Sequence, residues 1–381
     1  MRAFPPLMVV STLLGGAVRT ASAQTPASTS ARATTEGSGS SNGSNATPAE
    51  AKQPPPAPAP PPPIKSHRWV DMQVAQLDAR YRFIDNSAGT TTSNHLQQRE
   101  LFRAGVKFDK AGRYSVQMAA GSGGNFAGSW DSSGPGTGDT DLHMYVRHLY
   151  VAAAPIKGVE VQFGGIGFVR GESTEITSYD NDGFMVGERI SVKRRKQTQL
   201  DEIAFTTGHL GDIETPNVFR RFDGLAHHNF AQILTSRRFG TRTSASLDWT
   251  VADHQDTFHE AIRIAIKESR IVDGVRLELY ERVTGVTGKG FAISVDRALT
   301  KTFSMSGGYA TVDRFAALNA DRFQRGRRAF VEGRYALTPE ITLSTFFTRA
   351  FHNDFAVPVR TRFDLVFTYN VLKGLHRVGV W

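Results

Sequence analysis

The stretch FDLVFTYNV, residues 363–371, shows the pattern that decides the fold of this chain. Aromatic and aliphatic residues stand at every second position, with Asp364, Thr368 and Asn370 among the residues between them. Successive side chains of a β-strand point to opposite faces, so this alternation is typical of a strand with one apolar face. Helical spacing would instead place charged residues on the apolar stripe.

The same alternation recurs from about residue 69 to the C-terminal region. The other clear examples are 77–83, 102–108, 262–267 and 275–280. The pattern predicts sixteen strands, centred near 78, 104, 117, 147, 162, 189, 204, 232, 247, 263, 278, 294, 307, 332, 345 and 367. The strands near 189, 204 and 232 are weak and the region 186–202 is ambiguous, so fourteen or eighteen strands stay open.

The connections between these segments alternate between short and long. The short ones are predicted at 109–112, 155–158, 299–302 and 338–340, and the long, polar, Gly-rich ones at 85–98, 122–141, 168–183, 209–228, 313–326 and 351–360. Short turns at one end and long loops at the other are typical of an up-and-down antiparallel barrel that crosses a membrane. The fold class predicted is therefore all-β, a transmembrane β-barrel.

Composition narrows the class of protein. The chain has 381 residues, a formal net charge of +9 and no Cys, which excludes disulfide scaffolds and thiolate metal sites. No run of 18 apolar residues occurs after the N-terminus, which excludes a helical membrane protein. A globular soluble protein and a membrane barrel both remain, because alternating strands hide their hydrophobicity from averaging.

The N-terminal region differs from the rest. Arg2, an apolar core at 4–18 and the small residues Ala21-Ser22-Ala23 predict a signal peptide over 1–23, cleaved near Ala23. Residues 24–65 are rich in Ser, Thr, Ala and Pro and predict a disordered linker that ends in a stiff Pro run. The barrel is then expected over 66–381.

An export signal, alternating strands, unequal connections and the C-terminal Trp381 together make the chain similar to Gram-negative outer-membrane barrels of the porin type. The resemblance implies a location in the bacterial outer membrane, the lipid bilayer and the barrel-assembly machinery as partners, and a homotrimer as an open alternative. Arg377 and Gly379 depart from the usual final strand, so the last ten residues are expected to form a short tail or an extra half-strand.

The residues that alternate with the apolar ones would line a channel. The bases on this face are Arg80, Arg82, Arg103, Lys107, Arg263, Lys267, Arg276, Arg282, Arg328, Arg334 and Arg362, and the acids are Asp78, Glu160, Glu278, Asp296, Glu332 and Asp364. Unpaired charges buried at this density in a soluble sandwich would each cost several kcal/mol, whereas a water-filled channel leaves them solvated. The excess of bases predicts a channel for small hydrophilic solutes with a weak preference for anions.

In porins the third long loop commonly folds inward, and its counterpart here is 168–183. The resemblance implies a constriction with the charged residues Arg170, Glu172, Glu175, Asp180 and Asp182. Acids in this loop opposite wall arginines would set up a field across the channel. A solvated surface loop is the alternative.

Motifs for catalysis and cofactors fail on their spacing. His259-Glu260 lacks the second His of a zinc motif, and Gly285–Gly290 lacks the spacing of a phosphate loop. Asp180–Gly183 lacks the ligand spacing of an EF-hand, which leaves a loosely held Ca²⁺ open. The sequence therefore predicts no enzyme, cofactor or metal site, and the spread of basic residues predicts no nucleic-acid partner.

Two other functions stay open. The first is an outer-membrane barrel with an enzymatic or adhesive function in its loops, suggested by His209, His227, His228 and His254. The second is a secreted soluble β-sheet binding protein.

Overall fold

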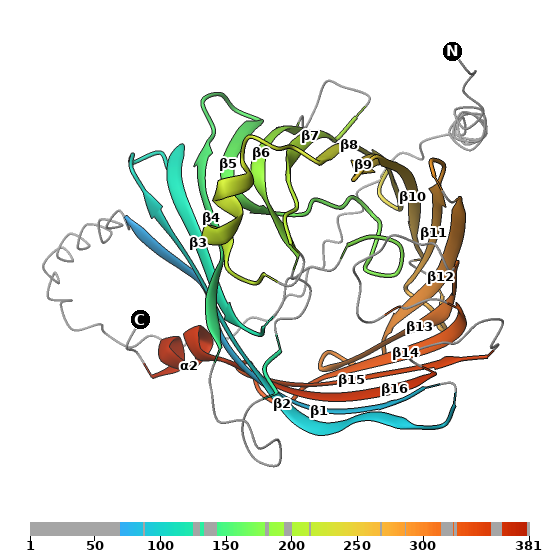
Figure 1. The fold of residues 1–381 in the computed structure, drawn as a ribbon. Coiled ribbons are helices and arrows are strands. Elements are labelled where there is room, and N and C mark those ends of the chain that lie inside the picture. Colours follow the sequence, from blue (N-terminus) through green and yellow to red (C-terminus); the bar gives the residue numbers. More distant parts are fainter. Residues whose placement is uncertain are drawn as a thin grey trace, which may run out of the picture. The chain divides into compact units, whose positions relative to one another are not determined.

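The computed structural model describes residues 69–378 apart from 87, 125–129, 133–142, 180–182, 194–199, 213–214, 267–268, 286, 314–322, 324–325 and 352–359. Sixteen strands close into an antiparallel barrel in which each strand pairs with its neighbours in sequence and β16 pairs with β1 (Figure 1). The strands are β1 (Val70–Asp85), β2 (Thr91–Lys107), β3 (Tyr114–Ser122), β4 (Met144–Ala153), β5 (Val159–Gly167), β6 (Phe184–Lys193), β7 (Glu202–His209), β8 (Phe230–Phe239), β9 (Thr243–Ala252), β10 (Gln255–Ala265), β11 (Gly274–Arg282), β12 (Gly288–Ala298), β13 (Phe303–Val312), β14 (Gly326–Ala336), β15 (Ile341–Ala350) and β16 (Thr361–Asn370). Two short helices, η2 (Val218–Gly224) and α2 (Val371–Arg377), lie between β7 and β8 and after β16.

The all-β barrel and its sixteen strands are confirmed, and each predicted centre falls inside a strand. The ambiguous region 186–202 contains the end of β6 and the beginning of β7. One predicted link is wrong: 85–98 is not a long loop, because β2 already begins at Thr91 and pairs with β1 along this stretch. The stretch 91–98 is almost entirely polar, so alternation of apolar and polar residues could not reveal that it is a strand. Pairing with β1 satisfies the hydrogen-bonding groups of its backbone.

The chain after β16 forms a helix and not an extra half-strand. Asn370 caps α2, since its side chain accepts a hydrogen bond from the amide of Lys373 at 2.9 Å. Among the described residues, no helix is long and apolar enough to span a membrane. The predicted signal peptide, the linker and Trp381 lie outside the described residues.

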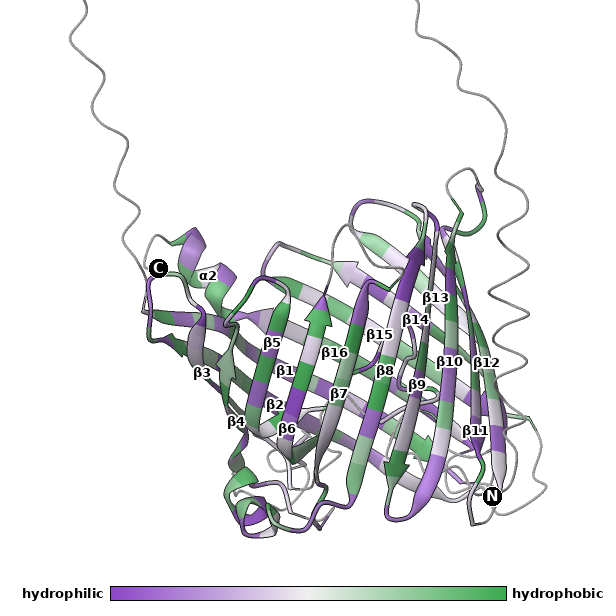
Figure 2. Cartoon of the chain, turned by 90° about the horizontal axis from the view of Figure 1, so that it is seen from above, coloured by the Kyte–Doolittle hydropathy of each residue, from purple (hydrophilic) through white to green (hydrophobic). Residues whose placement is uncertain are grey.

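The two faces of the barrel wall differ in chemistry. One face exposes large apolar side chains at alternate positions, which Figure 2 shows as alternating colours along the strands. Examples are Leu77, Phe163, Ile190, Phe205, Ile233, Trp249, Leu277, Ile293, Val331 and Phe367. Residues an odd number of positions away on the same strands, such as Arg80, Asp248 and Asp364, are buried and therefore face the interior of the closed barrel.

The five longest connections lie at one end of the barrel, as predicted, but the β1–β2, β9–β10 and β11–β12 connections at that end have at most five residues. The described tight turns are held by side chains, as when Thr300 Oγ1 accepts from the amides of Thr302 and Phe303. On the long-loop end, however, β9 and β10 are joined by only Asp253 and His254, with φ angles of 48° and 64°. Two successive positive φ angles define the type I′ turn that suits a two-residue hairpin.

Candidate functional site in the barrel interior

The segment that follows β5 folds into the barrel, as the green stretch inside the ring of strands in Figure 1 shows. The carbonyl of Val169 accepts a hydrogen bond from Gln232 Nε2 at 3.1 Å, and the amide of Glu172 donates to Ser246 Oγ at 2.7 Å. Gln232 and Ser246 lie on the interior faces of β8 and β9. The described part of this segment, 168–179, is called the inward segment below.

Glu278 on β11 anchors the inward segment. Its carboxylate accepts hydrogen bonds from the amide of Thr174 at 2.9 Å, from Thr174 Oγ1 at 2.7 Å and from the hydroxyl of Thr177. The Glu278 residue is only 1% exposed. A buried carboxylate is costly unless it is hydrogen-bonded, so these three donors both satisfy Glu278 and fix the segment.

Apolar contacts hold the inward segment at two places. Ile176 packs in a buried cluster on the other side of the interior with Ala292, Ala310, Phe323, Phe330 and Phe346. The first and last residues of the segment, Phe168 and Tyr179, stack on each other with ring centroids 4.4 Å apart. Burial raises the pKa of the Tyr179 hydroxyl well above its ordinary value. The inward segment therefore packs against side chains of the barrel wall inside the barrel.

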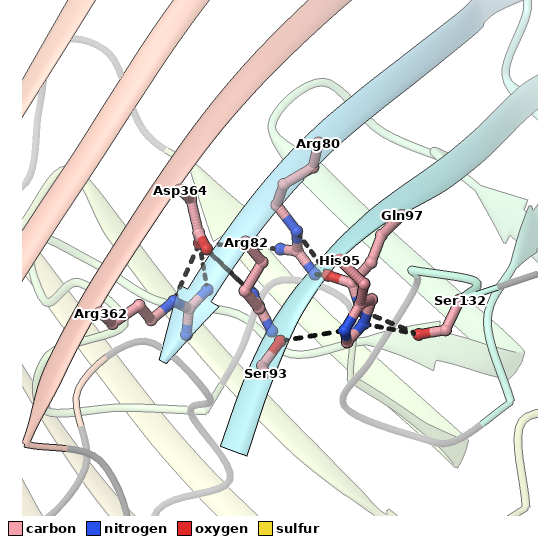
Figure 3. A network of polar contacts seen from close by, with 8 residues as sticks. All are labelled: Arg80, Arg82, Ser93, His95, Gln97, Ser132, Arg362 and Asp364. Atoms are coloured by element: carbon pink, nitrogen blue, oxygen red, sulfur yellow. Dashed lines mark hydrogen bonds and ion pairs between the residues drawn. The ribbon is translucent and has the colours of Figure 1, made fainter. Parts of the chain in front are cut away.

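Asp364 on β16 is the centre of a different interior network (Figure 3). It is 3% exposed, and it accepts from Arg82 Nε at 2.9 Å and from Arg362 Nη2 at 2.6 Å, while Arg80 Nη1 lies 3.9 Å away. Charge-assisted guanidinium–carboxylate bonds of this length are among the strong hydrogen bonds in proteins. Three arginines therefore share one buried carboxylate.

Arg99 extends this network onto β2. Its Nε donates to Asp78 at 2.7 Å, and Arg80 Nε donates to Gln97 at 2.9 Å. We call Arg80, Arg82, Arg99 and Arg362 the arginine cluster. Together with Asp78 and Asp364 it carries four positive and two negative formal charges.

A cavity of about 620 Å³ is bordered by members of the arginine cluster and by acidic residues. Arg80, Arg99 and Arg362 border it from β1, β2 and β16. The acids Glu175, Asp296 and Glu332 border it from the inward segment, β12 and β14, and they also line a second cavity of about 300 Å³. Arg297 on β12, Arg334 on β14 and Asp364 on β16 border the same cavity, so charges of both signs line it, and charges fixed on its walls set up a field inside it.

The inward segment carries partly paired charges. Glu172 lies 3.9 Å from Arg276, and Glu175 lies 3.9 Å from Arg170, measured between nearest oxygen and nitrogen atoms. Both separations are at the outer limit of an ion pair.

All ten residues expected to line a pore lie on interior strand faces. They are Arg80 and Arg82 on β1, Arg103 and Lys107 on β2, Arg263 on β10, Arg276 and Glu278 on β11, and Arg328, Glu332 and Arg334 on β14. Their part in a pore stays a prediction. Glu278 and Arg328, at 1% and 0% exposure, are enclosed by protein, whereas Arg334 is exposed. Asp180 and Asp182 lie outside the described residues.

Several interior residues were not predicted from the sequence. Ser246, Thr174 and Thr177 are short polar residues with no motif of their own. Phe330 and Phe346 carried a usable signal, because aromatic residues stand on strand faces that are otherwise polar. Ile176 carried a similar one, as an apolar residue within a polar loop.

The loop histidines do not form a metal site. His209 Nδ1 lies 2.9 Å from the carbonyl of His227, and His228 Nδ1 lies 3.0 Å from Thr207 Oγ1. Over the part of the chain that the structure describes, no three His, Asp or Glu side chains gather as metal ligands.

The helix η2 packs against the barrel, with Val218 in contact with Phe184 and Val186. Burial of Arg221 in this helix lowers the pKa of its guanidinium to about 10.

No protein-family model matches the chain, and no curated protein matches its sequence. Solved structures do share its fold. A mutant of Rhodopseudomonas blastica porin aligns with a TM-score of 0.53 at 9% identity, covering 79% of this chain and 99% of that one. A triple mutant of the same porin aligns with a TM-score of 0.52 at 11% identity and the same coverage of both chains. A structure described as "Asymmetric conductivity of engineered proteins" aligns with a TM-score of 0.53 at 9% identity, covering 79% of this chain and 100% of that one.

These likenesses define the class of fold: a closed sixteen-stranded antiparallel barrel of the porin kind. Its interior brings together an anchored inward segment, a cluster of arginines and a facing group of acids. Such an arrangement can select and orient charged solutes, and it presents charges and hydrogen-bond donors to anything that enters the cavity.

Proposed function

We propose that this protein is a channel through which small hydrophilic solutes diffuse passively across the bacterial outer membrane, without chemical catalysis. The observation that carries the proposal is the inward segment, which is tied to Ser246 and Glu278 inside the barrel and borders, through Glu175, a cavity of about 620 Å³. This segment is the constriction of the proposed channel. A cavity with charges on its walls favours small polar solutes over large or apolar ones.

The exposed apolar residues on the outer face support the membrane location. Side chains such as Leu277, Trp249 and Phe367 would contact the lipid bilayer. The signal peptide at 1–23 would direct export, the barrel-assembly machinery would insert the chain, and assembly as a homotrimer completes the proposal.

We further propose a weak preference for anions. The arginine cluster carries a net positive charge, and the acids across the cavity, Glu175, Asp296 and Glu332, oppose it locally. Wall charges are screened over about 30 Å at 0.01 M salt but over about 3 Å at 1 M. Preference for anions should therefore be largest at low ionic strength.

The test is the zero-current potential of the purified protein in planar bilayers across a tenfold KCl gradient. Replacing Glu172 and Glu175 together by Gln should increase the preference for anions if the inward segment is the constriction. The matched control is Glu281→Gln, a partly exposed acid on the outer wall face paired with Lys289 at 2.8 Å, which should change nothing. A strongly cation-selective wild type would reject the selectivity, and absence of conductance would reject the channel.

A further inference from the structure

The loop between β3 and β4 returns to the barrel wall at Trp130. Asp131 exchanges both backbone hydrogen bonds with Gln98, at 2.9 and 2.8 Å, and so adds a one-residue bridge to β2. The bridge lies beyond the part of β2 that pairs with β3, which begins at Leu101. The wall itself therefore holds this short piece of loop.

Side chains fix the same piece of loop on both sides of the bridge. Asp131 is 4% exposed and accepts from the amide of His143 at 2.8 Å. Ser132 Oγ accepts from Gln97 Nε2 at 3.0 Å and lies 3.3 Å from His95 Nε2 (Figure 3). Antiparallel pairing at Gln98 places Trp130 opposite Arg99, on the interior face.

The indole of Trp130 lies against two members of the arginine cluster. The guanidinium carbon of Arg80 is 3.8 Å from a ring centroid of Trp130, and that of Arg99 is 4.6 Å from it. Both distances are within the range of cation–π attraction. Trp130, Arg80 and Arg99 all border the cavity of about 620 Å³, and Arg362 and Phe346 border it as well.

The cavity therefore has an aromatic surface and positive charge side by side on its wall. An aromatic ring that enters the cavity can lie against Trp130 or against a guanidinium group that borders it, and a carboxylate on that ring is attracted by the positive charge of the arginine cluster. An aliphatic carboxylate would gain only the charge interaction, and an uncharged aromatic compound only the stacking.

We propose that Trp130, Arg80 and Arg99 form a binding subsite for small aromatic carboxylates within the cavity. The proposal rests on the proposed channel, because it names a class of solute that the channel would hold on its way through. Trp130 supplies the aromatic surface and the arginines supply the positive charge, so that ring and carboxylate are recognised together.

The test compares two blockers of KCl conductance in planar bilayers: benzoate, and cyclohexanecarboxylate, which has the same charge and a ring without π electrons. Benzoate should block wild type with an apparent affinity about fivefold higher than that of cyclohexanecarboxylate, the size of ratio that a cation–π contribution gives. Equal block by the two acids in wild type would overturn the subsite while leaving the channel intact.

Trp130→Leu should remove the difference between the two acids. The matched control is Trp249→Leu, which removes a tryptophan on the outer wall face that stacks on Phe258, and which should keep the difference. A difference that survives Trp130→Leu would overturn the assignment to Trp130.

Calorimetric titration of the folded protein in detergent separates this proposal from the channel. Tighter binding of benzoate than of cyclohexanecarboxylate by a protein that does not conduct would support the subsite and reject the channel. If Trp130→Leu fails to fold, the ratio of the apparent affinities of benzoate and cyclohexanecarboxylate for wild type still supports or rejects the subsite.

Discussion

Two interior carboxylates of this barrel, Glu278 on β11 and Asp364 on β16, are almost equally buried but have opposite surroundings. Glu278 accepts hydrogen bonds from an amide and two hydroxyls of the inward segment. Asp364 is bound by guanidinium groups of Arg82 and Arg362, with Arg80 close by. One acid holds a loop with neutral donors, and the other holds together like charges.

Facing the interior therefore does not fix the role of a charged residue. Removing Glu278 would free a segment of backbone, whereas removing Asp364 would leave arginines repelling one another. The first change should act mainly on the width and steadiness of the proposed channel. The second should act mainly on stability and on the charge that a solute meets.

The largest expected effect is that of Asp364→Asn. Breaking a buried ion pair by neutralising one partner costs about 3–5 kcal/mol, because the remaining charge stays in a poorly solvated place. We expect a loss of that order in the free energy of unfolding, measured by urea unfolding in lipid vesicles.

The control for Asp364→Asn is Asp71→Asn. Asp71 lies 3.6 Å from Lys107, and the two side chains are 46% and 34% exposed. An exposed pair contributes less than about 1 kcal/mol. Equal, small losses in the free energy of unfolding of the two variants would mean that water solvates the arginine cluster well. The proposed difference between the surroundings of Asp364 and those of Glu278 would then be wrong.

The second effect concerns Leu277, the neighbour of Glu278 on the outer face. Arginine on the lipid face of a barrel costs about 2–4 kcal/mol near the membrane midplane, so Leu277→Arg should impair folding into vesicles. Thr342→Arg, on an interior face with Ala336 and Thr368 as cross-strand partners, should fold normally. Equal folding yields for both variants would contradict the assignment of the two faces.

The third effect tests the anchor itself. Glu278→Ala leaves Thr174 and Thr177 without their acceptor, at a cost of about 1–3 kcal/mol, and should release the inward segment. Single-channel recordings should then show a larger and noisier conductance. Glu278→Gln keeps acceptor and donor capacity and should be milder. A Glu278→Ala protein with wild-type conductance and stability would show that the apolar contacts of Ile176 suffice.

The sequence predicted the wall well because period-two alternation depends only on local strand geometry. It predicted that Glu278 and Leu277 lie on opposite faces of β11, and in the structure Glu278 is buried in the interior whereas Leu277 is exposed on the outer face. It failed at 91–98, where pairing with β1 makes a strand of residues that are polar on nearly every position.

The filling of the interior could not be predicted in the same way. Whether Glu278 meets water or protein depends on where residues about a hundred positions away fold, and no local pattern encodes that contact. The bridge at Asp131 and the stacking of Trp130 are likewise set by tertiary packing. The signals that pointed to an interior packed with protein were Phe330 and Phe346 on polar strand faces and Ile176 within a polar loop.

The smallest effect extends the comparison to a carboxylate at the short-turn end. Glu340 in the β14–β15 turn accepts from Thr338 Oγ1 at 2.7 Å, and Arg377 of α2 lies 3.5 Å away. The hydrogen bond from Thr338, then that from its own backbone amide, and the Arg377 charge lower the pKa of Glu340 below its ordinary 4.5. Because the folded-state pKa is below the unfolded value, the carboxylate stabilises the fold above pH 4.5, and this contribution is lost as the pH falls through the folded-state pKa. Hydrogen exchange of the α2 amides should therefore quicken in acid more for wild type than for Glu340→Gln, which has no carboxylate to protonate. The same acid response in both proteins would show that α2 is held by the hydrogen bond from the Asn370 amide to the Glu340 carbonyl and by burial of Leu372, without help from the Glu340 charge.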